Sequence, residues 1–189
     1  MKQKLLSFYN ANKEAILFVV KLIGLYLILQ GFYDYILSPY TEIDSWLING
    51  IISTAEWGLS TLGFDLLHSN QLYQYHMGIA GTSGVVIGNP CDGLSLFILY
   101  TAFVMVFKGK WWMKFLFIVP GILLIHFLNV GRVMALALIV KYAPDTLDFH
   151  HSYTFTLLVY AFIFALWMIR IKVYQKTSST LNKRSQEID

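Results

Sequence analysis

Charged residues are scarce in this chain of 189 residues: 13% are Asp, Glu, Lys or Arg, while 57% are apolar. A soluble domain usually carries about 25% charged residues. So few charges cannot coat the water-facing surface of a domain of this size. The apolar residues also occur in long runs, and a helix needs roughly 20 of them to cross hydrocarbon. The composition excludes an ordinary soluble domain. It predicts an all-α polytopic membrane protein, one domain over residues 1–189 with about four to six transmembrane helices.

Cysteine is almost absent, and charge is confined to a few places. Cys91 is the only cysteine, which excludes an internal disulfide. The net charge of +3 is small, and lysine and arginine concentrate near both ends of the chain and in residues 108–114. Such clustering beside apolar segments indicates membrane orientation and argues against nucleic-acid binding. Membrane lipid is therefore the first partner that we expect.

The placement of basic residues predicts which segments face the cytoplasm. Residues 38–92 and 141–152 are poor in lysine and arginine. Under the positive-inside rule the basic stretches are cytoplasmic and the basic-poor stretches face outward. About four crossings of the cytoplasmic (inner) membrane satisfy this arrangement. Both termini are then cytoplasmic: residues 1–14, and a flexible polar tail over 172–189.

Four apolar segments within a membrane core of residues 15–171 predict the crossing helices. They are residues 15–37, 94–107, 115–142 and 154–171. Proline cannot extend the hydrogen-bond ladder of a helix, so we expect the first segment to end at Ser38–Tyr40. The third segment would be roughly 40 Å long as a helix. That exceeds one straight crossing, and Pro120 and Gly131 are the places where we expect it to kink or break.

Two segments between the first two crossings have different patterns. Apolar residues in 43–64 recur every three or four positions opposite a polar stripe, which predicts an amphipathic helix. We expect this helix to lie in the membrane interface or against other helices, and the sequence leaves open whether it crosses. Residues 70–90 alternate loosely and contain several glycines, which predicts a small β-hairpin. An open ribbon has unpaired backbone groups, so the hairpin must lie outside the hydrocarbon, on the extracytoplasmic side.

Polar residues that a membrane helix should avoid mark the candidate site. Cys91 stands at the start of the second crossing, Arg132 lies deep in an apolar context, and the histidine pair 150–151 precedes the last crossing. Arg132 follows Lys114, at the cytoplasmic interface, by roughly 27 Å of helix. Hydrocarbon is roughly 30 Å thick, so Arg132 should reach the outer boundary, where Cys91 and the histidines also lie. Asn129, one helical turn before Arg132, is placed to brace it.

Cysteine, arginine and histidine together suffice for acyl transfer. A thiolate attacks a carbonyl carbon well, and a nearby histidine or arginine favours the thiolate form. The guanidinium supplies a permanent charge and fixed donors that stabilise the oxyanion of a tetrahedral intermediate. Histidine protonates the leaving amine near neutral pH. The residues thus predict nucleophilic catalysis by Cys91 with Arg132 and one of the two histidines.

Three motifs resemble those of the exosortase/archaeosortase family of membrane-embedded cysteine transpeptidases. They are Cys91-Asp92-Gly93 at a helix start, Asn129-Val130-Gly131-Arg132 in a later helix, and His151 with Phe155 before the final crossing. The resemblance covers about residues 70–171, including the glycine-rich stretch, in a chain shorter than the best-known members. It implies that Cys91 is the nucleophile, Arg132 the oxyanion stabiliser and His151 the general acid and base.

The resemblance also implies the substrate class. Members of the family act on exported proteins with a C-terminal signal made of a short motif, a transmembrane helix and a basic tail. They cleave near the motif on the outer face and join the new end to an acceptor, often a surface lipid or glycan. We expect the same partners here. The substrate motif, the acceptor, the choice between hydrolysis and transfer, and the oligomeric state stay open.

One position departs from the family pattern, because Asp92 stands where a small residue or serine is usual. A carboxylate next to the thiol disfavours the thiolate unless it is paired, and Arg132 is the partner that the sequence suggests. The residues to which we assign supporting roles are Asn129, Asp92, Gly93 and His150. Spacing to Phe155 favours His151 over His150 as the catalytic histidine.

Two other classes of function remain as alternatives. A metal-binding membrane protein would use as ligands Cys91, Asp148, His150 and His151. However, adjacent histidines lack the i, i+4 spacing that places two imidazoles on one helix face. A non-enzymatic membrane assembly or transport component would need Arg132 to line a pathway. For the transpeptidase we expect no cofactor and no bound metal.

Overall fold

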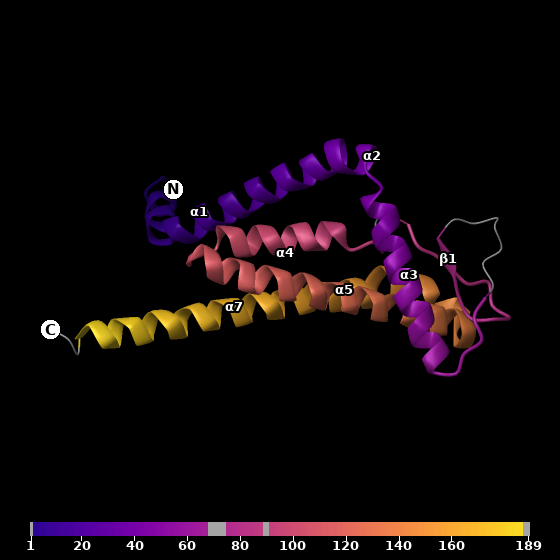
Figure 1. The fold of residues 1–189 in the computed structure, drawn as a ribbon. Coiled ribbons are helices and arrows are strands. Elements are labelled where there is room, and N and C mark those ends of the chain that lie inside the picture. Colours follow the sequence, from indigo (N-terminus) through magenta and orange to yellow (C-terminus); the bar gives the residue numbers. More distant parts are fainter. Residues whose placement is uncertain (1, 68–74, 89–90, 187–189) are drawn as a thin grey trace.

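The computed structural model describes residues 2–67, 75–88 and 91–186, and most of them are helical (Figure 1). The longer helices are α1 (Lys2–Phe32), α3 (Ile43–Thr61), α4 (Leu94–Val106), α5 (Trp111–Tyr142) and α7 (Phe155–Gln186). After α1 come a π-helical turn (Tyr33–Leu37) and α2 (Ser38–Tyr40). Before α7 come a 3₁₀ turn (Pro144–Thr146), α6 (Leu147–Phe149) and a second π-helical turn (His150–Thr154).

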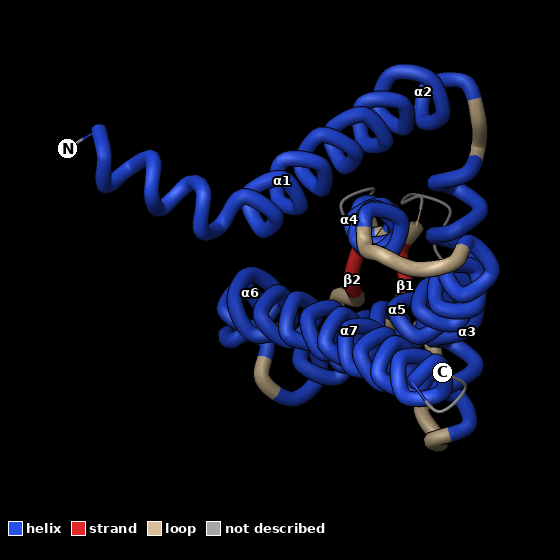
Figure 2. The backbone as a smooth tube through the Cα atoms, turned by 90° about the vertical axis from the view of Figure 1, so that its left-hand side faces the viewer, coloured by secondary structure: helices blue, strands red, loops and turns tan. Residues whose placement is uncertain are grey.

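The helices α1, α4, α5 and α7 run side by side as a bundle whose two ends differ (Figure 1). One end, called here the lysine end, holds Lys108, Lys110 and Lys114 in and after the loop between α4 and α5. The other end, called here the hairpin end, carries a two-stranded β-hairpin, with α3 crossing the bundle beside it. Seen along the helices, α4 lies between α1 on one side and α5 with α7 on the other (Figure 2).

Among the described residues, three helical stretches are long and apolar enough to cross a membrane: Asn12–Tyr40, Trp111–Tyr142 and Pro144–Thr177. This confirms the predicted all-α polytopic membrane fold. The helix α4 is also apolar, but its 13 residues cover only about 20 Å, less than the roughly 30 Å of hydrocarbon. Of the predicted crossings, the second is therefore the one whose helix is shorter than the hydrocarbon is thick. Non-helical chain near membrane depth must be buried in protein, and Asp92 and Gly93, just before α4, are buried.

The first crossing ends where the sequence predicts, whereas the third does not break at its proline. The helical stretch of the first crossing ends at Tyr40, with Pro39 in the first turn of α2, and Thr41 is extended. The helix α5 is a single helix with Pro120 inside it, so the break suggested there or at Gly131 does not occur. At roughly 48 Å, α5 is longer than the hydrocarbon is thick. Its excess length is used at the hairpin end, where α5 packs against α3.

The polar tail from residue 172 is helical, which corrects the prediction of a flexible segment. The helix α7 continues to Gln186, and residues 187–189 of the tail lie outside the described part of the chain. Lysine, glutamine and arginine are good helix formers, and extending an existing helix costs far less than starting one.

The helix α3 is amphipathic, as predicted, and it packs against α5. Its buried apolar residues are Ile48, Ile51, Ala55 and Leu59, at the three- and four-residue spacing of one helix face. Trp46 and Trp57 are exposed on α3, and tryptophan is enriched at membrane interfaces. The helix is not among those apolar enough to cross, which agrees with a place in the interface.

The predicted hairpin is present at the hairpin end. Strand β1 (His76–Met77) pairs antiparallel with β2 (Val85–Val86), in the register His76↔Val86 and Met77↔Val85. Just beyond β1, Ile79 forms an isolated bridge with Leu66. Of the segment predicted as a hairpin, residues 70–74 and 89–90 lie outside the described part of the chain.

Two clusters of buried apolar residues hold the bundle. The cluster at the hairpin end joins α3, the hairpin and α5: Ile48, Ile51, Ala55, Leu59, Met77, Ile79, Ile87, Val130, Val133 and Ala137. The cluster toward the lysine end joins α4, α5 and α7: Tyr100, Phe103, Val104, Ile125, Val159 and Ile163. Because α5 contributes to both clusters, it fixes the hairpin end relative to the membrane helices.

Candidate active site

The local backbone places Cys91 at the start of α4. Gly93 precedes the helix with a φ of 84°, in the left-handed region that favours glycine. A Cβ on Gly93 would also lie 3.3 Å from Nδ2 of Asn129 on α5. Gly93 therefore allows both the sharp turn into α4 and the close approach of this turn to α5.

Asn129 fastens the backbone of Cys91 to α5. Its Nδ2 donates a hydrogen bond to the Cys91 carbonyl oxygen at 2.7 Å, and the side chain is only 1% exposed. Leaving such a buried group unpaired costs about 1–3 kcal/mol, so this bond strongly favours one position of the loop. The sequence suggested that Asn129 braces Arg132. The structure corrects this, because the bond of Asn129 goes to Cys91 and sets where the cysteine lies.

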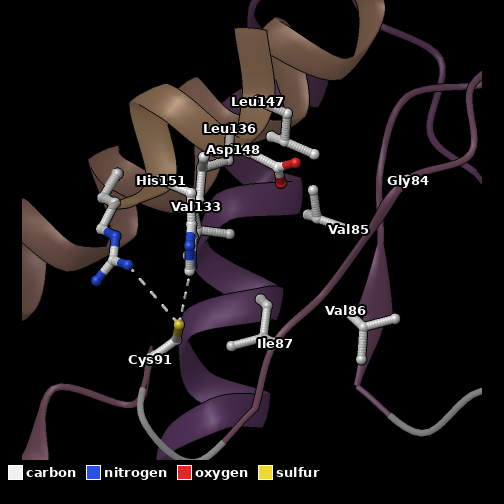
Figure 3. A pocket seen from close by; sticks show the side chains of 11 residues that line it. Gly84, Val85, Val86, Ile87, Cys91, Val133, Leu136, Leu147, Asp148 and His151 are labelled. Atoms are coloured by element: carbon white, nitrogen blue, oxygen red, sulfur yellow. Dashed lines mark hydrogen bonds between the residues drawn. The ribbon is translucent and has the colours of Figure 1, made fainter. Parts of the chain in front are cut away.

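The side chains of Cys91, Arg132 and His151 come from three separate segments and converge, and Figure 3 shows the imidazole of His151 directed at the Cys91 sulfur. Cys91 Sγ lies 3.6 Å from His151 Nε2 and 3.8 Å from Arg132 Nη2. Cys91 and Arg132 are half-buried, and His151 is exposed. The structure thus brings together the three residues that the sequence predicts as catalytic, at the hairpin end of the bundle.

A cavity of about 280 Å³ opens beside these three side chains. Its wall is formed by the β2 segment, α5 and the turns before α7 (Figure 3): Gly84, Val85, Val86, Ile87, Cys91, Arg132, Val133, Leu136, Leu147, Asp148 and His151. Ligand pockets usually span roughly 300–1,000 Å³, so this cavity is small. Its ionisable groups are the thiol, the guanidinium, the imidazole and the Asp148 carboxylate.

The charge of Arg132 is available to the cavity. Within the described residues, its Nε has no hydrogen-bond partner, and no carboxylate lies within ion-pair distance of its guanidinium. A guanidinium of this kind can stabilise a thiolate or a developing oxyanion. His151 Nε2 is near enough to Sγ to exchange a proton with it. The arrangement can therefore support attack by a thiolate on a carbonyl carbon.

The predicted pairing of Asp92 with Arg132 is wrong. Asp92 does not pair with Arg132, and it does not line the cavity. It is 3% exposed, and its Oδ1 accepts a hydrogen bond from Leu94 N at 2.8 Å, which caps α4. Its Oδ2 accepts from Tyr33 OH at 3.5 Å, and the same hydroxyl donates to Asp44 Oδ1 at 2.5 Å. Burial raises the pKa of Asp92 to about 6, and the nearby Asp44 adds to the rise.

The two adjacent histidines point to different partners. His151 lines the cavity and approaches Cys91, as described above. His150 is half-buried, its Nδ1 lies 3.1 Å from Thr154 Oγ1, and its ring meets Phe149 and Phe155. In the ranges that the structure describes, no group of three or more His, Cys, Asp or Glu side chains is placed to hold a metal ion.

Sequence reasoning missed the polar layer behind Cys91. Tyr33, Ser38 and Asp44 are joined by hydrogen bonds, with Ser38 Oγ donating to Asp44 Oδ2 at 2.6 Å. No motif marks these residues. The available signal was that polar groups at the end of one apolar helix and the start of the next, if buried, must pair with each other.

Comparison with protein-family models matches residues 11–171 to the family described as transmembrane exosortase (Exosortase_EpsH). The matched stretch contains every segment that lines the Cys91 cavity. Comparisons with curated proteins and with solved structures gave no significant match. Since one family model spans the molecule from the first crossing helix to the last, the chain belongs to the transmembrane exosortase family.

Proposed function

We propose that this chain is a membrane cysteine transpeptidase that cleaves the C-terminal sorting signals of exported proteins and transfers the cleaved proteins to an acceptor. The observation that carries the proposal is the position of Cys91 Sγ, 3.6 Å from His151 Nε2 and 3.8 Å from Arg132 Nη2. Membership of the exosortase family supports the same class of activity.

The first half of the reaction makes a thioester. His151 Nε2 takes the proton from the Cys91 thiol, and the sulfur attacks the carbonyl carbon of the scissile peptide bond. The oxyanion of the tetrahedral intermediate receives hydrogen bonds and charge from Arg132. As the C–N bond breaks, the leaving amine takes the proton held by His151, and the exported protein stays on Cys91 as a thioester.

The second half releases the product. An acceptor nucleophile gives its proton to His151 and attacks the thioester carbon, with the oxyanion again facing Arg132. When the intermediate collapses, the sulfur leaves as a thiolate and recovers the proton from His151. With an amine as acceptor the result is transfer, and with water it is hydrolysis.

The proposed orientation places the site on the outer face of the cytoplasmic membrane. The lysine end holds the basic loop, which the positive-inside rule assigns to the cytoplasm. The cavity beside Cys91 is lined by residues 84–87 of the hairpin, which lies at the opposite end (Figure 1). Exported proteins reach that side, and their C-terminal helices would lie in the bilayer beside the bundle.

Mass spectrometry of exported proteins tests the proposal. In cells carrying the natural chain, exported proteins with a C-terminal apolar helix should lack that helix. In cells carrying Cys91→Ala, Arg132→Ala or His151→Ala, they should keep it. Normal processing by the Cys91→Ala chain would remove the enzymatic proposal.

The neighbouring histidine supplies a matched control. His150→Ala changes the same residue type one position away, but His150 faces Thr154 instead of the thiol. We expect this variant to process substrates at close to the natural rate. A scaffold or transport component would respond to neither histidine substitution, and Cys91→Ser would leave its function unchanged.

A further inference from the structure

The Cys91 cavity follows β2 and not β1. Every residue from Gly84 to Ile87 lines it, and neither residue of β1 does. Side chains alternate along a strand, and Figure 3 shows Val85 and Ile87 directed into the cavity and Val86 directed the other way. A cavity bordered by both sets of residues meets the backbone edge of the strand, in addition to one of its faces.

The hydrogen-bond pattern leaves this edge of β2 open. Ile87 N donates to Tyr75 O at 3.0 Å, so these two residues form a hydrogen-bonded pair. Such pairs alternate along an antiparallel ribbon with pairs whose N–H and C=O groups point outward. Val86, opposite His76, belongs to the second kind and directs both groups away from β1. Across residues 2–67, 75–88 and 91–186, no further strand pairs with that side of β2.

The opposite edge of the hairpin is covered at residues 78–80, just beyond β1. Leu67 N donates to Gly78 O, and Ala80 N donates to Asp65 O, both at 2.8 Å. Unpaired strand edges invite pairing with other chains, and natural proteins usually cover or shorten them. Here one edge is covered, and the open edge is the one that borders the candidate nucleophile. An open edge in this position is suited to adding a strand from a bound peptide.

We propose that β2 binds the substrate by strand addition, with an extended segment just before the scissile bond paired to the backbone of Val86. The inference rests on the proposed function and names how that site holds its peptide. Val86 supplies one N–H donor and one C=O acceptor, which recognise any extended main chain. Beside this edge, Val133 and Leu136 of α5 form an apolar wall for a side chain of the peptide.

The direction of the added strand follows from the topology. From β2 the chain runs toward the start of α4, which is from the hairpin end into the bundle (Figure 1). In the proposed orientation the exported domain lies beyond the hairpin, and its C-terminal helix lies in the membrane. The peptide therefore runs parallel to β2 and delivers its scissile carbonyl to Cys91.

Val86→Pro tests the pairing. Proline removes the N–H that faces the cavity, and an edge strand tolerates proline where the N–H has no ladder partner. We expect the processing of exported proteins whose maturation depends on Cys91 to slow about tenfold or more. Val86→Thr keeps the N–H and should process substrates much faster than Val86→Pro. Alkylation of Cys91 by iodoacetamide reports whether the site is intact, and both variants should react like the natural chain.

A cross-linking experiment keeps the test decisive if Val86→Pro disturbs the fold. Val86 is replaced by photoreactive p-benzoylphenylalanine in a chain that also carries Cys91→Ala, and cross-linked peptides are identified by mass spectrometry. We expect cross-links to residues just before the cleavage point, and none from the same group placed at the exposed Trp57 of α3.

Two outcomes overturn strand addition: natural processing by Val86→Pro, or cross-links from residue 86 that are absent or fall only after the cleavage point. Normal processing by Cys91→Ala would instead overturn the proposed function itself. The two failures are therefore distinguishable.

Discussion

The two ends of the bundle are held by different interactions. At the lysine end, aromatic rings interlock: Phe103 stacks on Trp167 with centroids 4.3 Å apart and meets Phe18 edge-on at 5.6 Å. Such pairs add about 0.5–1.5 kcal/mol each beyond burial of their area. At the hairpin end the buried core is aliphatic, and the buried polar side chains Asp92 and Asn129 lie beside it. The lysine end is thus held by the packing of aromatic rings, whereas the hairpin end holds buried polar side chains in defined orientations.

Two arginines show this difference most clearly. Arg170, at the lysine end, is fully buried, and its guanidinium lies over Phe107 at 5.4 Å and over Phe117 at 4.9 Å. Arg132, at the hairpin end, is half-buried, and its Nη2 lies 3.8 Å from the Cys91 thiol in the wall of the cavity. The first has the surroundings of a residue that joins helices, and the second has those of a residue that acts on a ligand. Substitutions at the two positions should therefore affect different quantities.

The largest effect is expected from Arg132→Lys. Lysine keeps the charge but loses the fork of donors that can follow an oxyanion. Loss of one oxyanion donor typically costs about 10²–10³ in rate, and we expect a decrease of that size in substrate processing. The melting temperature in detergent should change little, because Arg132 is not part of either apolar cluster.

Arg170→Lys is the matched control for this prediction. It should lower the melting temperature, because a compact ammonium cannot replace the planar guanidinium between the rings. The processing rate of the folded fraction should stay near the natural value. If Arg132→Lys lowered stability and Arg170→Lys abolished processing in folded protein, the division between the two ends would be wrong.

Two glycines on α5 offer a test of shape alone. A Cβ on Gly121 would collide with the ring of Tyr100, which is 1% exposed. A Cβ on Gly131 would meet nothing within 4 Å, although Gly131 adjoins Arg132. We expect Gly121→Ala to destabilise the fold by about 1–3 kcal/mol through overpacking. Gly131→Ala should leave thermal unfolding unchanged or slightly raise its midpoint, because alanine favours helix.

The two glycine substitutions also test whether a position in a family motif matters more for stability than a close contact does. Gly131 stands inside the Asn-x-x-Arg motif, whereas Gly121 stands in no motif. Equal destabilisation by the two alanine substitutions would mean that the close contact with Tyr100 does not limit the fold.

Much of the helical fold could be predicted from the sequence. The length of an apolar segment and the spacing of its apolar residues reflect whether each helix face meets lipid, water or protein. The amphipathic pattern of residues 43–64 gave part of the face that α3 buries, namely Ile51, Ala55 and Leu59. Helix continuity at Pro120 could not be predicted, since membrane helices tolerate proline when neighbouring groups satisfy the freed backbone. The short length of α4 could be predicted from the length of its apolar segment. The depth of Cys91 could not, because it depends on how the chain before α4 is buried.

For the candidate site, depth along a helix was enough to bring Cys91, Arg132 and the histidine pair to one level. The partner toward which each polar side chain points was not predictable. Asn129 and Asp92 were each expected to pair with Arg132, yet one bonds the Cys91 carbonyl and the other caps α4. Sequence spacing gives neighbours on one helix, whereas these partners come from packing between helices. The edge of β2 beside the thiol likewise depends on tertiary packing.

The polar layer at the hairpin end should respond to pH, and Asp92→Asn tests this. The pKa of the Asp92 carboxyl is raised from 3.8 to about 6 by burial. The folded chain thus holds this proton more tightly than the unfolded chain, so stability falls as pH rises from about 4 to about 6 and then levels off. Asparagine keeps an oxygen for Leu94 N and carries no charge. Its melting temperature should therefore rise relative to the natural chain across this window.

Thermal unfolding between about pH 4 and 7.5 measures the difference between the two chains. Asp92→Ala is the control for capping, because it loses the bond to Leu94 N and should cost about 1 kcal/mol at every pH in the range. Identical pH profiles for the natural chain and Asp92→Asn would show that the buried layer does not titrate there.

The smallest effect is expected from the ion pair at the lysine end. Lys108 Nζ lies 2.9 Å from Glu14 Oε2, and this contact raises the pKa of Lys108, but the two side chains are 73% and 87% exposed. Water screens such a pair, and holding two long side chains together costs entropy, so exposed pairs often contribute nothing measurable. Lys108→Ala should leave the melting temperature unchanged, since Arg170 Nη2 bonds the backbone oxygen of residue 108, which the substitution keeps. A loss as large as that of Gly121→Ala would mean that charge, and not interlocking rings, holds this end together.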